Sequence, residues 1–170
     1  MPLVMKTKTN KKRIVLLDTH AIIHRAYHAL PELTGPGGAP TGALYGLVSM
    51  LLKIITDLKP DYIAASLDTP EPTFRDKEYA DYKAHRAPTS DELIPQLKKA
   101  PAVYEVFGVR SFAIPGFEAD DLIGSFVEMF KDEPDLKIVI LSGDRDVLQL
   151  VEGEKVVGQL FKTGITETVI

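Results

Sequence analysis

Seven acidic side chains follow short apolar runs in four separate segments of this sequence. Carboxylates that gather in one place repel one another, and a bound cation relieves that repulsion. Hard oxygen ligands suit Mg²⁺ or Mn²⁺, and two such ions roughly 3.5–4 Å apart can clamp both reacting oxygens of a phosphodiester. If the fold brings the segments together, we expect a divalent-metal site. Its candidate ligands are Asp18, Asp68, Glu118, Asp120, Asp121, Asp144 and Asp146.

Each acidic segment also has a simpler local interpretation. Acids in the first turn of a helix interact favourably with its dipole and need no metal, and Asp144 is a suitable residue to cap the helix that follows it. Asp18 and Asp68 are harder to explain in this way, because aspartate is depleted in strands and each of them ends a predicted strand. The joint placement of the four segments therefore favours the metal site.

The elements that must position these side chains alternate between strands and helices. Apolar runs rich in β-branched residues predict strands at 13–18, 62–68, 111–114 and 137–142, with weaker strands at 156–160 and 167–170. Between them, helices are expected at 19–30, 41–58, 74–86, 90–107, 118–131 and 146–151. Such alternation is typical of an α/β fold with a mostly parallel central sheet. The carboxyl ends of its strands would then bring the acidic segments to one edge.

Three boundaries depend on particular residues. Thr41 and Ser90 are predicted to cap the helices that follow them. Pro95 and Pro101 lie inside the helical pattern at 90–107. Because an interior proline costs about 3 kcal/mol, we expect a kink or two short helices there.

Composition limits the classes of protein to consider. The chain has 170 residues, 45% of them hydrophobic, and a net charge of −4, which is typical of one soluble domain. It lacks cysteine, which excludes disulfides and thiolate metal sites. No apolar run reaches the roughly 20 residues of a membrane helix, so we expect a cytoplasmic protein. Residues 1–12 are interpreted as a basic disordered tail and 13–170 as one domain.

Two further groups of residues have types and spacing that could bind a ligand. His20, His24 and His28 are four residues apart, but no fourth ligand is near them in sequence, so they are interpreted as helix residues rather than a zinc site. The stretch 75–86 mixes four basic with three acidic residues. Its composition favours a solvated helix, while its lysine, arginine and tyrosine side chains could also bind single-stranded nucleic acid.

Six motifs, in order, give the chain a resemblance to a known family. After Leu17-Asp18, they read HRAYHA (24–29), APTGALYG (39–46), TFRD (73–76), YKAHR (82–86), GFEADD (116–121) and SGDRD (142–146). Together they resemble the 5′-nuclease domain of bacterial DNA polymerase I, over residues 13–170. The resemblance implies a PIN-like α/β fold and a two-metal 5′–3′ exonuclease or flap endonuclease that hydrolyses DNA phosphodiesters in replication and repair. It further implies a monomer that acts on 5′ ends, flaps, nicks and RNA–DNA hybrids beside a polymerase domain.

The resemblance also implies roles for individual residues. Asp144 and Asp146 would lead to the second metal site, and the other five acids would build the first. Lys83 and Arg86, on a helical gateway, would stabilise charge on the scissile phosphate. Arg25 and Arg75 would contact phosphate, and Tyr82 would stack on a base. For 75–86, the resemblance thus replaces the solvated helix with a substrate gateway.

The resemblance also marks a departure and leaves two alternatives. The family's nuclease domain continues past the last residue here, with further aspartates for the second metal and a helix–hairpin element that grips duplex DNA. We therefore expect both to lie outside this chain, and a PIN-type ribonuclease and a non-catalytic DNA-binding remnant remain alternatives. A dehalogenase-type phosphatase needs an aspartate two residues after Asp18, where this chain has His20. A receiver domain would need paired acids at the first strand and a phosphorylatable aspartate followed by a lysine, and the arrangement here differs.

Overall fold

A single mixed sheet forms the centre of the molecule in the computed structural model, which describes residues 11–79, 88–161 and 167–169. The sheet has six strands, in the order β3 (Arg110–Phe112), β2 (Tyr62–Ser66), β1 (Lys12–Asp18), β4 (Leu136–Ser142), β5 (Val156–Phe161) and β6 (Glu167–Val169). The first five are parallel, and β6 runs antiparallel to β5. The predicted α/β fold with a mostly parallel sheet is therefore confirmed. Of the tail predicted at 1–12, residues 1–10 lie outside the described residues, and Lys12 is the first residue of β1 instead.

The strands and helices follow the alternation expected from the sequence. The α-helices are α1 (Thr19–Ala29), α2 (Gly42–Leu58), α3 (Phe74–Glu78), α4 (Ile94–Val106) and α5 (Ala119–Phe130). Two 3₁₀ turns complete the described chain, η1 (Pro36–Gly38) and η2 (Arg145–Leu150).

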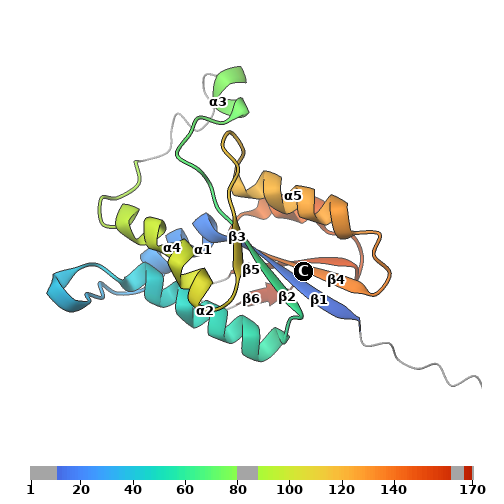
Figure 1. Ribbon diagram of the computed structural model, residues 1–170, viewed down its shortest axis with the longest axis horizontal. Coiled ribbons are helices and arrows are strands. Elements are labelled where there is room, and N and C mark those ends of the chain that lie inside the picture. The colour runs from blue at the N-terminus through green and yellow to red at the C-terminus, as the bar shows by residue number, and fades with distance from the viewer. Residues whose placement is uncertain (1–10, 80–87, 162–166, 170) are drawn as a thin grey trace, which may run out of the picture.

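Helices cover both faces of the sheet (Figure 1). Alternate residues of β1 point to opposite sides: Val15 and Leu17 join a core formed with α1, α2 and α4, whereas Ile14 and Leu16 join a core formed with α5 and η2. The central strands are buried on both faces, as their continuous apolar runs require. The sheet thus lies between two hydrophobic cores.

Helices α1 and α2 approach closely on one face. A Cβ atom at Gly46 would lie 2.4 Å from the Cβ of Ala26, so only glycine allows the two backbones this separation. The buried positions of α2 recur at helical spacing and seat α2 against the core: Ala43, Gly46, Leu47, Met50, Leu51 and Ile54. The opposite side of α2 leaves Leu52 and Ile55 exposed.

Several predicted boundaries were wrong in detail. β2 ends at Ser66, two residues before Asp68. Thr41 occupies the position before α2, but its hydroxyl donates to the Leu33 carbonyl at 3.2 Å and does not cap the helix. Ser90 begins a turn, and α4 starts only after Leu93.

Helix α4 also departs from the prediction, because it runs unbroken past Pro101. Pro95 lies in its first turn, where an N–H group has no helical partner to lose. Ala100 and Tyr104 are fully buried. The hydroxyls of Tyr104 and Thr19 form a hydrogen bond of 3.0 Å. We attribute the continuity of α4 to this packing, which offsets the cost of the interior proline.

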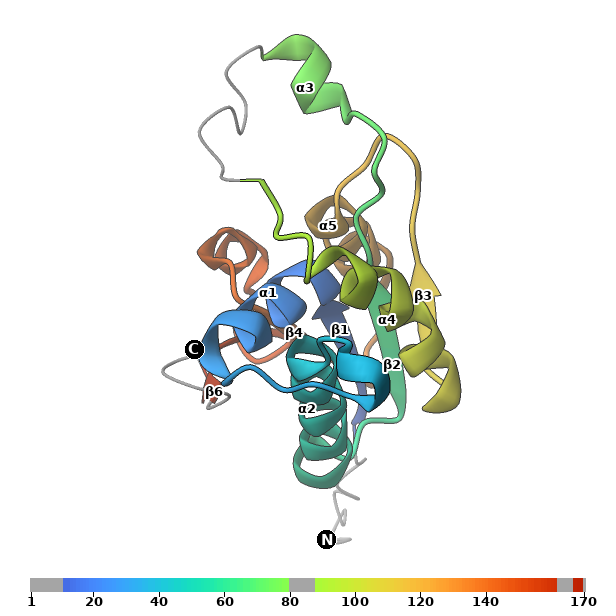
Figure 2. The ribbon, with the colours of Figure 1, turned by 90° about the vertical axis from the view of Figure 1, so that its left-hand side faces the viewer.

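A small helix stands away from the rest of the molecule. Figure 2 shows α3 projecting beyond the end of the sheet at which β1 and β2 finish. The sequence predicted a helix over 74–86; it is present from Phe74 to Glu78, and 80–87 lie outside the described residues. In the part of the chain that the structure describes, no helix is both long and apolar enough to cross a membrane.

Candidate metal centre at the carboxyl edge of the sheet

The candidate site lies where the chain changes direction across the sheet. β1 pairs with β2 on one side and with β4 on the other, and from β1 the chain first builds β2 and β3 before returning to β4. In open parallel sheets, ligands bind beyond the carboxyl ends of the strands at such a switch point. Asp18, Asp68 and Asp144 all lie at this edge, at or just after the ends of β1, β2 and β4.

Asp18 is buried between the ends of β1 and β4. Only 7% of Asp18 is exposed. Its Oδ1 accepts from the Ala21 N–H at 3.0 Å and so caps α1, and its Oδ2 accepts from the Ser142 hydroxyl at 2.6 Å. Burial raises the pKa of Asp18, and its hydrogen bonds to Ser142 and Ala21 oppose that rise. The negative charge of Asp68 contributes further to the increase.

Asp68 joins the end of β2 to the start of α5. Its Oδ1 accepts from the Ala119 N–H at 2.6 Å, in the first turn of that helix. Its Oδ2 lies 3.5 Å from Nδ1 of His20, a contact that becomes an ion pair when the histidine is protonated. The rings of His20 and His24 stack with centroids 6.1 Å apart. The side chain of Asp68 thus lies between α1 and α5.

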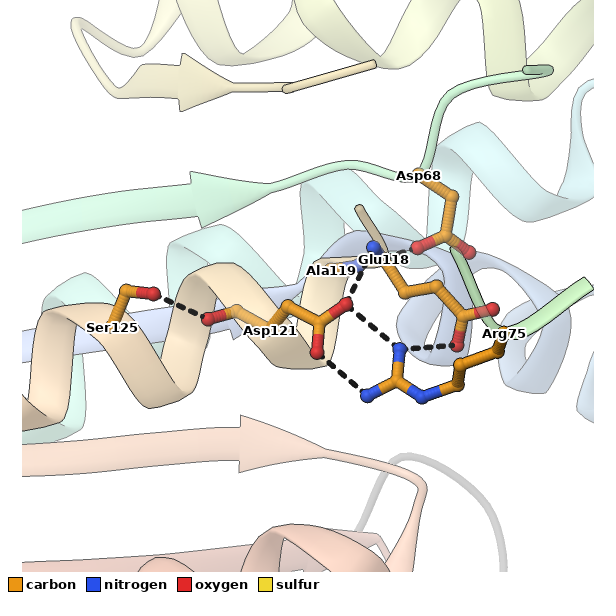
Figure 3. A network of polar contacts seen from close by, with 6 residues as sticks. All are labelled: Asp68, Arg75, Glu118, Ala119, Asp121 and Ser125. Carbon is orange, nitrogen blue, oxygen red and sulfur yellow. Dashed lines mark hydrogen bonds and ion pairs between the residues drawn. The ribbon is translucent and has the colours of Figure 1, made fainter. Parts of the chain in front are cut away.

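An arginine lies among the carboxylates of α5 (Figure 3). The two terminal nitrogens of Arg75 donate to the two carboxylate oxygens of Asp121 at 2.8 and 2.6 Å. One of these nitrogens also lies 3.7 Å from Oε2 of Glu118, whose side chain is 9% exposed. Asp121 in turn accepts from the Glu118 N–H at 3.0 Å and so caps the helix. Asp121 therefore supports both the arginine and the backbone of α5.

The remaining acids extend the edge towards η2. Asp120 and Asp146 line one pocket together with Arg75 and Asp121. Partial desolvation, followed by the charge of Asp121, raises the pKa of Asp120, and Arg75 opposes the rise. Asp144 caps η2 through the Asp146 N–H at 3.0 Å, and its own N–H donates to the Ser142 hydroxyl at 3.0 Å. Ser142 thus links Asp144 to Asp18.

The chemistry of these donors fits a hard divalent cation, because they supply carboxylate oxygens from four chain segments. In the described part of the chain, however, no three His, Asp or Glu side chains stand close enough together to hold a metal ion. Arg75, Ser142 and backbone N–H groups occupy the oxygens of Asp18, Asp68 and Asp121 instead. Ligation by the seven predicted acids therefore stays a prediction.

The predicted substrate-contacting residues are placed unevenly. Arg75 lies among the acids. Arg25 is half-buried on α1, two turns along the helix from Asp18. Lys83 and Arg86, predicted as catalytic, and Tyr82, predicted to stack on a base, lie outside the described residues.

Two residues of the edge were missed by sequence reasoning. Ser142 ends the predicted strand at 137–142 and begins the SGDRD motif, but no role was predicted for its hydroxyl, which contacts both Asp18 and the Asp144 N–H. His20 was interpreted as a helix residue, and its contact with Asp68 was not predicted. The available signal was position: each lies within two residues of a predicted ligand.

Comparisons with known proteins agree with this architecture. The model of the family described as "5'-3' exonuclease, N-terminal resolvase-like domain" matches residues 13–169. DNA polymerase I of Caldicellulosiruptor bescii is 41% identical over 157 residues, which are 92% of this chain and 18% of the polymerase. The 5'-3' exonuclease of Aquifex aeolicus is 37% identical over 140 residues, which are 82% of this chain and 48% of that protein.

A solved structure shares the fold. The T5 5'-exonuclease with bound zinc ions superposes with a TM-score of 0.71 at 21% identity, and the match covers 92% of this chain and 58% of that chain. The chain described here thus spans less than two thirds of each of these three proteins. From the family match and the two curated relatives, the chain belongs to the 5′–3′ exonuclease family, in its N-terminal resolvase-like domain.

Proposed function

We propose that this chain acts in a divalent-metal-dependent 5′–3′ exonuclease and structure-specific flap endonuclease, which hydrolyses DNA phosphodiesters in replication and repair. The observation that carries the proposal is the set of carboxylates at one edge of the sheet, at the end of β1, just after β2 and at the starts of α5 and η2, in a chain of this family. The zinc ions in the T5 5'-exonuclease support the use of divalent metal. We propose that the cation in this protein is Mg²⁺ or Mn²⁺, bound at two sites.

The chain's own residues would perform three tasks. The acids of the edge, from Asp18 to Asp146, would hold the cations. Bound there, divalent ions would neutralise phosphate charge and lower the pKa of a water molecule. Arg75 and Arg25 would contact the phosphate backbone, and Lys83 and Arg86 would stabilise charge on the scissile phosphate.

The same proposal extends to substrates and partners. Tyr82 would stack on an unpaired base near the 5′ end. We propose that the substrates are DNA with 5′ ends, flaps or nicks, together with RNA–DNA hybrids, and that the protein works as a monomer in the cytoplasm. A DNA polymerase domain is the proposed partner, supported by the DNA polymerase I relative.

Cleavage of two matched substrates tests the proposal. The 170-residue chain is incubated with Mg²⁺ or Mn²⁺ and either a 5′-flap DNA or a single-stranded RNA of the same sequence as the flap. We expect metal-dependent cleavage near the flap junction and little cleavage of the RNA. Preference for the RNA would identify a PIN-type ribonuclease instead, and cleavage of neither substrate would contradict catalysis by this chain.

An Asp144→Ala variant provides the inactive control. Asp144 is exposed at the edge, and its loss removes one proposed ligand and the cap of η2. We expect cleavage to be abolished while the circular dichroism spectrum of the variant stays like that of the wild type. Wild-type cleavage by this variant would remove Asp144 from the site.

A further inference from the structure

Arg75 occupies both oxygens of a carboxylate that the proposed function assigns to metal. Its guanidinium forms a two-pronged contact with Asp121 at 2.8 and 2.6 Å, and it lies 3.7 Å from Glu118. Paired hydrogen bonds between arginine and carboxylate are among the strongest polar contacts in proteins. Both carboxylate oxygens of Asp121 are thus engaged, by Arg75 and by the Glu118 N–H (Figure 3).

The same arginine is part of α3, the helix that projects from the molecule (Figure 2). Its carbonyl accepts from the Tyr79 N–H at 2.9 Å, and its guanidinium lies 4.7 Å from the ring centroid of Phe74. Phe74 packs against Phe117, with ring centroids 6.0 Å apart, and its N–H donates to the Gly116 carbonyl at 3.3 Å. The contact between Arg75 and Asp121 therefore ties α3 to the first turn of α5.

A cation that binds Asp121 must compete with this contact. Mg²⁺ binds carboxylate oxygens at about 2.0–2.1 Å. The guanidinium of Arg75 already donates hydrogen bonds to both carboxylate oxygens of Asp121. Two positive groups that converge on one carboxylate repel each other. Metal binding should therefore weaken the contact between Arg75 and Asp121. By thermodynamic linkage, that contact should weaken metal binding by the same factor.

We propose that Arg75 is a positioning residue that couples α3 to the occupancy of the metal site. In the metal-free protein, Asp121 holds Arg75 and with it the base of α3. A divalent ion at Asp121 releases the guanidinium, which becomes available to a phosphate of the substrate, an anion that suits the arginine fork. The inference rests on the proposed function, because it takes Asp121 to be a metal ligand.

Calorimetric titration with Mn²⁺ tests the coupling without any measurement of activity. Arg75→Gln removes the competing fork, and we expect Mn²⁺ to bind this variant about tenfold more tightly, within the usual range of coupling between sites. Arg75→Lys keeps the charge but loses the fork, so we expect it to bind Mn²⁺ more tightly than the wild type and less tightly than Arg75→Gln. Lys131→Gln, which breaks an ion pair with Glu128 at the other end of α5, serves as the control for net charge and should match the wild type.

Amide hydrogen exchange supplies the second readout. We expect Mn²⁺ to accelerate exchange in the segment 72–79 of the wild type, because the tie to α5 is lost. In Arg75→Gln, exchange of that segment should be fast already, with or without Mn²⁺. Circular dichroism of each variant establishes that it is folded, and if Arg75→Gln is unfolded, Arg75→Lys carries the comparison.

The outcomes separate the two proposals. Equal or weaker Mn²⁺ affinity in Arg75→Gln would overturn the coupling and leave the metal site intact. Wild-type affinity in Arg75→Lys would show an effect of net charge alone and would also overturn it. Absence of Mn²⁺ binding by the wild type would overturn the proposed function together with the coupling.

Discussion

The two ends of the acidic edge manage negative charge differently. At the β1–β4 end, Asp18 is buried and receives hydrogen bonds from neutral groups, the Ser142 hydroxyl and the Ala21 N–H. At the α5 end, Asp121 is partly exposed and faces the permanently charged guanidinium of Arg75. Neutral donors only partly offset the desolvation of a carboxylate, so the pKa of Asp18 is raised. A guanidinium, in contrast, compensates the charge directly.

This difference indicates a division of labour within the edge. The Asp18 end is fixed by the core, because β1 and β4 are buried strands that pair along most of their length. The α5 end depends on α3, which is attached through Arg75 and the Phe74–Phe117 contact. We therefore expect Asp18 to define a rigid half of the proposed metal centre and Asp121 to define an adjustable half.

Of the effects that test this comparison, the largest is expected on cleavage by an Asp18→Asn variant. Asparagine keeps the capping interaction with α1 but removes the charge needed to hold a cation. We expect the rate of flap cleavage to fall by about 100- to 1000-fold, the scale found when one group that stabilises transition-state charge is removed. The free energy of unfolding at neutral pH, measured with urea in EDTA, should not fall, because the variant has no charge to bury at this position.

Asp57→Asn is the matched control for this experiment. Asp57 is an exposed acid of α2 that pairs with Lys53, away from the edge. Its replacement should leave the cleavage rate unchanged. A wild-type rate of cleavage by Asp18→Asn would contradict the proposal that Asp18 holds metal in a rigid half of the centre.

A smaller effect is expected on stability when Ser142 is replaced by alanine. The change removes the donor to Asp18 and the acceptor of the Asp144 N–H, so a buried carboxylate oxygen loses its partner. We expect urea denaturation to show a loss of about 1–3 kcal/mol.

Ser125→Ala provides the comparison at the α5 end, because the Ser125 hydroxyl is exposed and donates only to the Asp121 carbonyl. The loss in free energy of unfolding caused by Ser125→Ala should stay within about 0.5 kcal/mol. Equal losses at Ser142 and Ser125 would show that the two ends are supported alike.

The smallest expected effect is a dependence of stability on pH in the absence of metal. The folded-state pKa of Asp18 lies above its unfolded-state value, mainly because of burial. As pH rises from about 4, the unfolded chain releases this proton first, so the free energy of unfolding falls until the raised pKa is passed. For one proton, the slope is at most about 1.4 kcal/mol per pH unit.

The measurement is the difference in free energy of unfolding between the wild type and Asp18→Asn, taken at a series of pH values in EDTA. This difference should decrease as pH increases through the window, because only the wild type carries the titrating group at position 18. A difference that stays constant, or that increases with pH, would place Asp18 in a well-hydrated setting like that of the exposed acids.

Much of this architecture could be predicted from local patterns. The apolar runs at 13–18 and 137–142 predicted the two central strands to within one residue. The acids that follow these runs were expected at one edge, and Asp18, Asp68 and Asp144 lie there. These predictions succeed because a strand buried on both faces requires a continuous apolar run, whatever its neighbours are.

Other features depend on contacts that local patterns do not encode. A break at Pro101 was predicted, but burial of Ala100 and Tyr104 accompanies an unbroken α4. Asp68 was expected to end β2, yet it lies two residues beyond the strand and accepts from the Ala119 N–H. In each case a partner distant in sequence decides the local structure.

The sequence by itself determined the strands, most of the helices and the presence of acids after the strand ends, because these follow from hydrophobic periodicity and from the chemistry of single residues. Only the tertiary structure decided which groups meet. Ser142 reaches Asp18 across 124 positions and Arg75 reaches Asp121 across 46, because β4 pairs beside β1 and α3 returns to the start of α5. Such pairs leave no periodic signal, since their geometry is set by strand order and helix packing over the whole chain.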